Sequence, residues 1–239
     1  MEVKDKVVIV TGASSGIGEA TARLLADQGA RVALAARSVG KLESFAKELP
    51  GSLVAPVDMT DEASIKRMVA DVAAHYGRVD VLINNAGRGS TWLPVEAVKV
   101  DDFRRLVELN VYGPIIAMQQ VIPIMREQGG GAIVNVGSGT VHMLMEGAGM
   151  YPGTKILLSH VSRVARLELA KDGITVSLLH PYITATNFFT NIERGGDEPV
   201  VARPGMMENA HTPQKVADAI LDIIRTGAEE VSLSPGRQG

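Results

Sequence analysis

Short apolar runs alternate with amphipathic stretches along the chain, and this alternation limits the possible folds more than any other feature. The runs are rich in Val, Ile and Leu, and they cover residues 7–10, 31–36, 52–57, 79–83, 132–136, 174–179 and 230–233. Strands that are apolar on both faces and separated by helices are typical of a parallel sheet covered on two sides. The sequence therefore predicts a doubly wound α/β fold with a parallel sheet of about seven strands and helices on both faces.

Two of the intervening stretches carry signals for helix ends. Thr60 is suited to N-cap a helix that ends at Gly77, because its hydroxyl accepts from first-turn N–H groups and glycine tolerates a left-handed backbone. Thr212, which precedes a proline, is suited to begin a helix that ends at Gly227. We expect both helices to pack an apolar stripe against the sheet.

Composition excludes several classes of protein. A chain of 239 residues suits one domain with a substantial core, so we expect a single domain over residues 1–239. The net charge of −3, without long charged runs, argues against nucleic acid or an anionic membrane as a partner. Cysteine is absent, no apolar run approaches the ~18 residues of a membrane span, and no signal-peptide pattern is present. We therefore expect a cytoplasmic protein.

A glycine-rich turn, TGASSGIG at residues 11–18, joins the first predicted strand to the first predicted helix. Glycine allows a tight turn and lets backbone N–H groups approach a pyrophosphate at the helix N-terminus. We therefore expect a dinucleotide to bind here, and the alternative is an ordinary tight turn between a strand and a helix. The predicted contacts within the turn are Gly12, Ser14, Ser15, Gly16, Ile17 and Gly18.

The end of the second strand bears on which dinucleotide is bound. NAD sites place a carboxylate here for the ribose 2′-hydroxyl, but this chain has Arg37 followed by Ser38. A guanidinium suits a 2′-phosphate, so NADP(H) is favoured and NAD(H) is the alternative. Asp58, with Met59 after it, ends the third strand and is expected near the adenine, or else to cap the following turn.

The segment YPGTK places Tyr151 and Lys155 four residues apart, about one turn of a helix. A free tyrosine has a pKa near ~10, and a cation some ~4 Å away is worth about 4 kcal/mol at an effective dielectric constant of ~20. We therefore expect Lys155 to lower the pKa of Tyr151 enough for proton transfer near neutral pH. Pro152 suits a helix start, since its missing N–H has no partner there.

With the glycine-rich turn, NNAG at residues 84–87, Asn110, Ser138 and YPGTK in this order, the chain resembles the short-chain dehydrogenase/reductase family, in its single-domain branch. The resemblance runs from about residue 5 to the C-terminus. It implies a Rossmann-type fold with a cofactor half over about 1–130, a catalytic half over about 131–239 and a lid over about 184–210. It also implies a homo-oligomer, a dimer or a tetramer.

The resemblance implies a catalytic tetrad of Asn110, Ser138, Tyr151 and Lys155. Tyr151 would be the general acid in carbonyl reduction and the base in alcohol oxidation, and Ser138 would hydrogen-bond the substrate oxygen. Lys155 would bond the nicotinamide ribose and lower the pKa of Tyr151, helped by the charge of the oxidised nicotinamide. The physical requirement is consistent with this, because hydride transfer to a carbonyl carbon needs a proton on its oxygen.

Further cofactor contacts follow from the same resemblance. Asn85, Ala86 and Gly87 match the adenosine-side segment, and Thr184 and Thr186 match residues near the nicotinamide carboxamide. The sequence departs from the family at Tyr182, where a glycine is usual, so the loop or pocket there is expected to differ.

Asn110 lies in a helical stretch over about 101–126 that Gly113 and Pro114 interrupt. Pro114 has no N–H to donate to the Asn110 carbonyl. In the family this carbonyl holds a water that links the lysine to solvent. We hypothesise that Pro114 keeps this acceptor free, and the alternative is a tolerated kink.

Two variable stretches, residues 139–150 and 187–207, carry the large apolar side chains that are expected to bind substrate. They are Met143, Leu144, Met145, Met150, Phe188, Phe189, Met206 and Met207. We therefore expect a hydrophobic ketone or secondary alcohol, or else a set of residues that only bury the lid. His142, Glu146, His160 and His180 lack metal-ligand spacing, so no metal is expected, although His180 can line the cleft. A redox sensor without turnover and a lyase or epimerase remain as alternatives.

Overall fold

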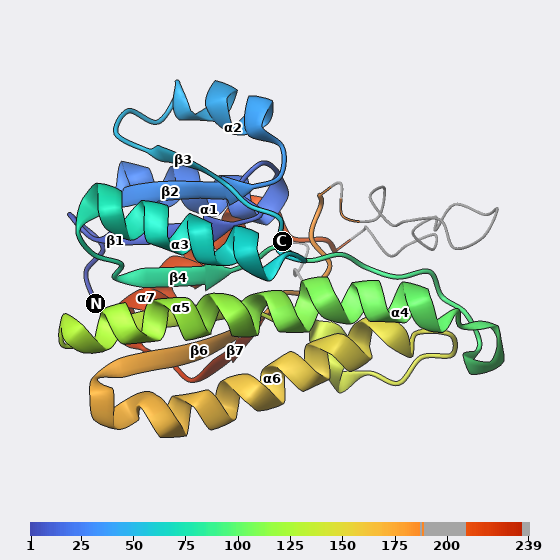
Figure 1. Ribbon diagram of the computed structural model, residues 1–239. Coiled ribbons are helices and arrows are strands. Elements are labelled where there is room, and N and C mark those ends of the chain that lie inside the picture. The colour runs from blue at the N-terminus through green and yellow to red at the C-terminus, as the bar shows by residue number, and fades with distance from the viewer. Residues whose placement is uncertain (187, 189–208, 236–239) are drawn as a thin grey trace.

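The computed structural model describes residues 1–186, 188 and 209–235 of the chain. In these residues seven strands form one parallel sheet in the order β3-β2-β1-β4-β5-β6-β7 (Figure 1). The strands are β1 Val7–Thr11, β2 Arg31–Ala36, β3 Leu53–Pro56, β4 Val81–Asn84, β5 Gly131–Val136, β6 Ile174–His180 and β7 Glu230–Ser232. The predicted doubly wound α/β sheet is confirmed, and the strand order reverses between β1 and β4.

Helices connect the strands, as the periodicity predicts. They are α1 Gly16–Asp27, α2 Val39–Ala46, α3 Glu62–Tyr76, α4 Val100–Val107, α5 Gly113–Glu127, α6 Met150–Leu169 and α7 Pro213–Thr226. Short helical segments are η1 Val95–Ala97, η2 Glu108–Tyr112, η3 Gly139–His142 and η4 Ala170–Asp172. In the described part of the chain, no helix has the length and apolarity to span a membrane.

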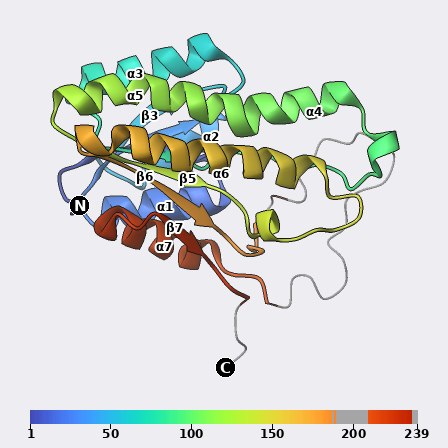
Figure 2. The ribbon, with the colours of Figure 1, turned by 90° about the horizontal axis from the view of Figure 1, so that it is seen from below.

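Each face of the sheet has its own hydrophobic core. One core contains Leu25 of α1, Leu42 of α2 and Ile220 of α7, whereas the other contains Val69 of α3 and Val121 of α5. Figure 1 shows α3, α5 and α6 in front of the sheet, and Figure 2 shows α1 and α7 on the opposite side. The sheet is therefore buried on both faces, which explains why its strands read as continuous apolar runs.

The helix ends agree with the sequence signals with one correction. Thr212 caps α7 by accepting from the N–H of Lys215, and α7 ends at Gly227, whose φ is +68°. The predicted N-cap at Thr60 is wrong, because α3 is capped by Asp61, whose carboxylate accepts from the N–H of Ala63. The Thr60 hydroxyl instead donates to the Asp58 carboxylate at 2.8 Å, and this bond removes it from the capping position.

The long helical stretch before β5 is interrupted earlier than Gly113. The segment η2 is a π-helix, in which the N–H of Gly113 donates to the carbonyl of Glu108, five residues back. Pro114 lies at the start of α5, where a missing N–H is tolerated. Since π-turns widen a helix locally and often lie at functional sites, this irregularity draws attention to Asn110 within it.

Candidate active site

Tyr151 and Lys155 lie in the first turns of α6, next to the carboxyl end of β5. Pro152 is accommodated in the first turn of this helix, as predicted. The Lys155 ammonium is buried and donates to the carbonyl of Val136, the last residue of β5, at 2.8 Å. It lies 6.0 Å from the centre of the Tyr151 ring. The helix thus brings the phenol and the ammonium to the same edge of the sheet.

Ser138 follows β5 by two residues and meets Tyr151, from the next helix. The Ser138 hydroxyl lies close enough to the Tyr151 hydroxyl to lower the pKa of that phenol. The Ser138 hydroxyl oxygen also lies 2.8 Å from the Thr140 hydroxyl and accepts from the Thr140 N–H at 3.3 Å. Two hydroxyl groups therefore lie together beside a buried ammonium, which is a pair of donors suited to one substrate oxygen.

The ionisation of this pair differs from the expectation from sequence. Burial raises the pKa of Tyr151 to about 12, although the nearby Ser138 hydroxyl acts in the opposite direction. Burial also lowers the pKa of Lys155 to about 8. The protein alone therefore keeps the phenol protonated at neutral pH, because desolvation disfavours both charged forms. The prediction that Lys155 by itself brings Tyr151 towards neutrality does not hold for this arrangement.

Asn110 links the loop after β4 to the start of α6. Its side-chain oxygen accepts from the N–H of Arg88 at 3.0 Å, and its amide donates to the Arg88 carbonyl at 2.9 Å. The amide also donates to the Thr154 hydroxyl at 3.1 Å, which itself donates to the Tyr151 carbonyl at 2.7 Å. This fully buried side chain is thus occupied by hydrogen bonds to Arg88 and Thr154.

The glycine-rich turn has the close approaches that only glycine permits. Gly12 and Gly16 have φ values of +70° and +58°, and a Cβ on Gly18 would lie 2.7 Å from the Asn85 amide nitrogen. Ser15 is the N-cap of α1, but its side chain makes no capping bond, which leaves its hydroxyl available to a ligand. Ser14 and Ile17 flank this position. The first N–H groups of α1 lack intrahelical acceptors, so the turn fits a phosphate chemically.

The loop after β4 is tied to β1 beside this turn. The Thr11 hydroxyl accepts from the N–H groups of Asn85 and Ala86, both at 3.0 Å, and the Asn85 amide donates to the Thr11 carbonyl at 2.9 Å. A Cβ on Gly87 would lie 3.2 Å from Asn110 Oδ1 and 3.4 Å from Lys155 Nζ. The loop thus runs from the glycine-rich turn to the predicted catalytic residues, across the point where the strand order reverses.

The residues after β2 and β3 lie at the same edge of the sheet. Arg37 is exposed after β2, and Ser38 is the N-cap of α2 without a side-chain bond. The Asp58 carboxylate accepts from the Thr60 N–H at 2.9 Å, so it caps this turn, as one of the two alternatives predicts. Burial raises the pKa of Asp58, but the bonds from Thr60 and the charge of Arg37 hold it below its usual value. Met59 is buried.

The segment after β6 reaches back to the glycine-rich turn. A Cβ on Gly16 would lie 3.0 Å from the methyl group of Thr186, and Thr184 is buried and pairs with His211 in an isolated bridge. Tyr182, the departure from the family pattern, packs its ring 5.8 Å from the His211 ring. Of the predicted lid over 184–210, residues 187 and 189–208 lie outside the described residues. This range includes Phe189, Met206 and Met207, which were expected to bind substrate.

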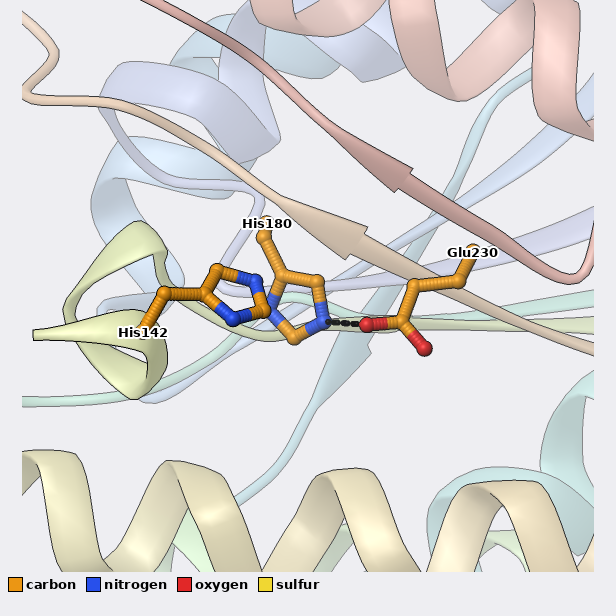
Figure 3. Close-up of side chains that lie close together, drawn as sticks. All are labelled: His142, His180 and Glu230. Atoms are coloured by element: carbon orange, nitrogen blue, oxygen red, sulfur yellow. Dashed lines mark hydrogen bonds and ion pairs between the residues drawn. The ribbon is translucent and has the colours of Figure 1, made fainter.

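One cluster was not predicted from sequence spacing. His142 in η3, His180 at the end of β6 and Glu230 in β7 each place a potential ligand atom within 4.8 Å of the others (Figure 3). His180 Nε2 lies 2.9 Å from Glu230 Oε1, and His180 Nδ1 lies 3.3 Å from the N–H nitrogen of Ser138. The second contact follows from the strand pairing, because the register of β5 and β6 ends with Val136 opposite Leu179, just before Ser138 and His180.

Comparison with known proteins agrees with this arrangement. Residues 6–196 match the short chain dehydrogenase family. An uncharacterised oxidoreductase of Staphylococcus saprophyticus is 33% identical over 222 residues, which cover 91% of this chain and 89% of that protein. The 3-ketoacyl-(acyl-carrier-protein) reductase of Brucella melitensis, solved with NADH, is 26% identical with a TM-score of 0.88, over 97% of both chains.

An alcohol dehydrogenase of the archaeon Thermococcus sibiricus, solved with 5-hydroxy-NADP, is 29% identical with a TM-score of 0.82, over 95% of both chains. The family match spans more than half of this chain and includes the glycine-rich turn, Ser138, Tyr151 and Lys155. The resemblance predicted from the motifs is thus confirmed. The chain belongs to the short chain dehydrogenase family and is an oxidoreductase.

Proposed function

We propose that this enzyme interconverts a ketone and a secondary alcohol with NADP(H), with Tyr151 as the general acid and base. The observation that carries the proposal is the placement of the Ser138 hydroxyl, close enough to Tyr151 to lower its pKa, beside the buried ammonium of Lys155. Family membership and the two solved structures above, one with NADH and one with an NADP analogue, support a nicotinamide dinucleotide as the cofactor.

The chain has suitable residues along the whole length of such a cofactor. The turn from Gly12 to Gly18 would hold the pyrophosphate at the N-terminus of α1. Asn85, Ala86 and Gly87 would border the adenosine side. Lys155, Thr184 and Thr186 would hold the nicotinamide end, since Thr186 lies against Gly16 and Lys155 lies next to Gly87. The nicotinamide would supply or accept the hydride.

In carbonyl reduction, the hydroxyl groups of Ser138 and Tyr151 would both donate to the substrate oxygen. Tyr151 would then transfer its proton to that oxygen as negative charge develops there. A phenol that stays protonated at neutral pH suits the role of donor. Lys155, with a pKa of about 8, is cationic at neutral pH and would stabilise the phenolate that remains.

Asn110 would complete the site through its backbone carbonyl. Its side chain is occupied by Arg88 and Thr154, and the π-turn and Pro114 lie around it. We propose that the Asn110 carbonyl holds a water that returns a proton to Lys155, with Pro114 keeping this acceptor free.

Arg37 supports NADP(H) over NAD(H). It is exposed at the end of β2, where no carboxylate replaces it, and it is close enough to Asp58 to influence the ionisation of that residue. A 2′-phosphate carries the charge that this guanidinium would pair with. Asp58 and Met59 would then lie on the adenine side.

Apolar residues beside Tyr151 support a hydrophobic substrate. The Phe188 ring lies 5.5 Å from the Tyr151 ring. Met143 and Leu144, in the loop before α6, expose 52% and 104% of their surface. An apolar ketone would cover these side chains.

Exposed apolar residues on α6 support a homo-oligomer. Ile156, Leu157, Val164 and Leu167 are all exposed, although they lie on the helix that carries Tyr151. A second copy of the chain would bury them.

The experiment that tests the proposed function measures NADPH and NADH oxidation against a panel of ketones from small alkyl to large cyclic. We expect turnover with NADPH and increasing kcat/KM with apolar size. Cofactor binding in a thermal-shift assay without turnover of any ketone or alcohol would contradict an enzyme of this type. Turnover without net change in cofactor absorbance would indicate a lyase or epimerase instead.

A further inference from the structure

The backbone of Ser138 contacts a buried histidine, His180. His180 has no exposed surface, and its Nδ1 lies 3.3 Å from the Ser138 amide nitrogen and 3.2 Å from the Ser138 carbonyl oxygen. The neighbouring residue must be small, because a Cβ on Gly137 would lie 2.5 Å from the same Nδ1. The imidazole is thus packed against the backbone that carries the serine hydroxyl.

Which Ser138 group bonds to Nδ1 depends on the tautomer of His180. If Nε2 carries the proton, Nδ1 is an acceptor for the Ser138 N–H, whereas a proton on Nδ1 would pair it with the Ser138 carbonyl. The two tautomers of His180 therefore bond different backbone groups of Ser138, one its N–H and the other its carbonyl. The partner of Nε2 therefore decides how Ser138 is held.

That partner is an ionised carboxylate. Glu230 Oε1 lies 2.9 Å from His180 Nε2, and Arg163 donates to both Glu230 oxygens at 2.9 Å (Figure 3 shows the contact with His180). Burial raises the pKa of Glu230, but Arg163 and His180 hold it below its usual value. A carboxylate only accepts hydrogen bonds, so Nε2 carries the proton. Burial lowers the pKa of His180, and the ring stays neutral despite Glu230.

We propose that His180 is a positioning residue for Ser138, held by Glu230 and Arg163 in the tautomer whose Nδ1 accepts the Ser138 N–H. The series of hydrogen bonds from Arg163 through Glu230 and His180 to Ser138 fixes the serine backbone. Through the backbone it also fixes the direction of the hydroxyl that would bind the substrate oxygen. This inference rests on the proposed function, in which Ser138 contacts the reacting oxygen. It adds residues from α6, β6 and β7 to the support of the site.

The same cluster has the ligand types of a zinc site, but its charges favour the positioning role. The Glu230 carboxylate already pairs with a guanidinium, which would lie next to any bound cation. Nε2 would have to lose its proton to bind a metal, and the bond to Glu230 would be lost with it. His142 is exposed and contacts the cluster through its ring, 5.3 Å from the His180 ring.

The first test removes Glu230, the partly exposed carboxylate that accepts the hydrogen bond from His180 Nε2. Glu230→Leu frees Nε2, and we expect ¹⁵N chemical shifts of the imidazole to move from the Nε2–H tautomer towards the Nδ1–H tautomer. We expect kcat to fall about tenfold with KM within about twofold, because Ser138 would act mainly in the transition state. Glu229→Leu is the matched control, since Glu229 is exposed on the adjacent position and we expect it to change neither quantity.

The second test asks whether the effect passes through the Ser138 hydroxyl. In a Ser138→Ala background the same Glu230→Leu change should alter kcat less than about twofold, since the hydroxyl that it misdirects is gone. His180→Asn keeps an acceptor near the Nδ1 position and should retain kcat within about threefold, whereas His180→Leu should lose about tenfold. His160→Leu, at an exposed position of α6, is the control for replacing a histidine.

The outcomes separate this inference from the proposed function. A parent enzyme that reduces no ketone would remove the proposed function, while the imidazole shifts still report the tautomer. An Nδ1–H tautomer in the parent, or an equal loss of kcat in the presence and absence of the Ser138 hydroxyl, would overturn the positioning role. Zn²⁺ binding by calorimetry that Glu230→Leu abolishes would also overturn it, in favour of a metal site.

Discussion

The ammonium of Lys155 lies 6.0 Å from the centre of the Tyr151 ring and is turned to the carbonyl of Val136. Two unit charges at about this separation attract by roughly 3 kcal/mol at an effective dielectric constant of ~20, or roughly 2 pKa units. Burial acts in the opposite direction and raises the pKa of Tyr151 to about 12. We infer that the phenol becomes a usable base only when the charge of an oxidised nicotinamide is added to that of Lys155.

Activity should fall at alkaline pH as Lys155 loses its proton. Burial lowers the pKa of Lys155 to about 8, so kcat/KM for ketone reduction should decrease above about pH 8 as the ammonium loses its proton. The native protein binds fewer protons than the unfolded chain between pH 8 and about 10.5, so this group makes folding more favourable as pH rises through that range. Lys155→Met should abolish the decrease of kcat/KM at alkaline pH. A profile that is unchanged in Lys155→Met would contradict the assignment.

Arg37 should determine the choice of cofactor. Arg37→Asp should weaken NADPH binding by roughly 2 kcal/mol or more, about thirtyfold in Kd, because it removes a charge-assisted bond and adds a repulsive charge. The Kd of NADH should stay within a few fold or improve. Calorimetric titration of both cofactors measures this, and Lys41→Asp, also exposed and in α2, is a control for the change of charge. Unchanged preference for NADPH would refute the role of Arg37.

Pro114 should matter for proton return. Pro114→Ala restores an N–H that can compete for the Asn110 carbonyl, so we expect a lower kcat and a changed solvent isotope effect. Pro123→Ala, at a proline in the interior of the same helix α5, is the matched control for proline removal. If the isotope effect and the pH profile are the same in Pro114→Ala and the parent, the proline is only a tolerated kink.

Asp80 should be important for stability rather than for activity. Its carboxylate accepts from Arg78 at 2.6 and 2.8 Å and from the Val7 N–H at 2.9 Å. We expect Asp80→Asn to lower the free energy of unfolding by roughly 2 kcal/mol. Denaturant titration with the matched variant Asp71→Asn, an exposed position of α3, measures this difference.

The contribution of Asp80 should also depend on pH. Burial raises the pKa of Asp80, but Arg78, Val7 and Lys6 more than compensate and hold it below its usual value. The stabilisation is therefore complete above about pH 4, the pKa of the unfolded chain, and is lost as pH falls through the lower folded value. If Asp80→Asn and the parent differ equally at pH 3 and pH 7, the carboxylate is not the source of the stability.

Local patterns were sufficient to predict the fold, whereas most of the candidate site residues came from the family resemblance. The apolar runs gave the strands because a sheet buried on both faces needs continuous apolar residues. The spacing of Tyr151 and Lys155 placed them on one helix face, and the family resemblance pointed to Ser138, which lies just after β5. The N-cap of α3 was misplaced by one residue, since Thr60 and Asp61 are both good caps and only the bond from Thr60 to Asp58 decides between them.

The remaining features depend on contacts between distant segments. His180 and Glu230 meet because β6 and β7 pair in register, with His180 opposite Ser232, and no spacing rule predicts such a pair. The raised pKa of Tyr151 results from the depth of burial, which a sequence pattern of Tyr and Lys does not reveal. The π-turn at Asn110, between α4 and α5, was likewise not predicted from the sequence.

The most direct measurement is the ionisation of Tyr151 itself, with and without bound cofactor. Tyrosine labelled at the ring carbon that bears the hydroxyl group, assigned by comparison with Tyr151→Phe, reports the pKa by NMR. We predict a pKa of about 12 in the protein alone and a fall of several units with NADP⁺, together with a loss of at least about a hundredfold in kcat for Tyr151→Phe. A Tyr151→Phe enzyme that reduces ketones at the rate of the parent would contradict the account.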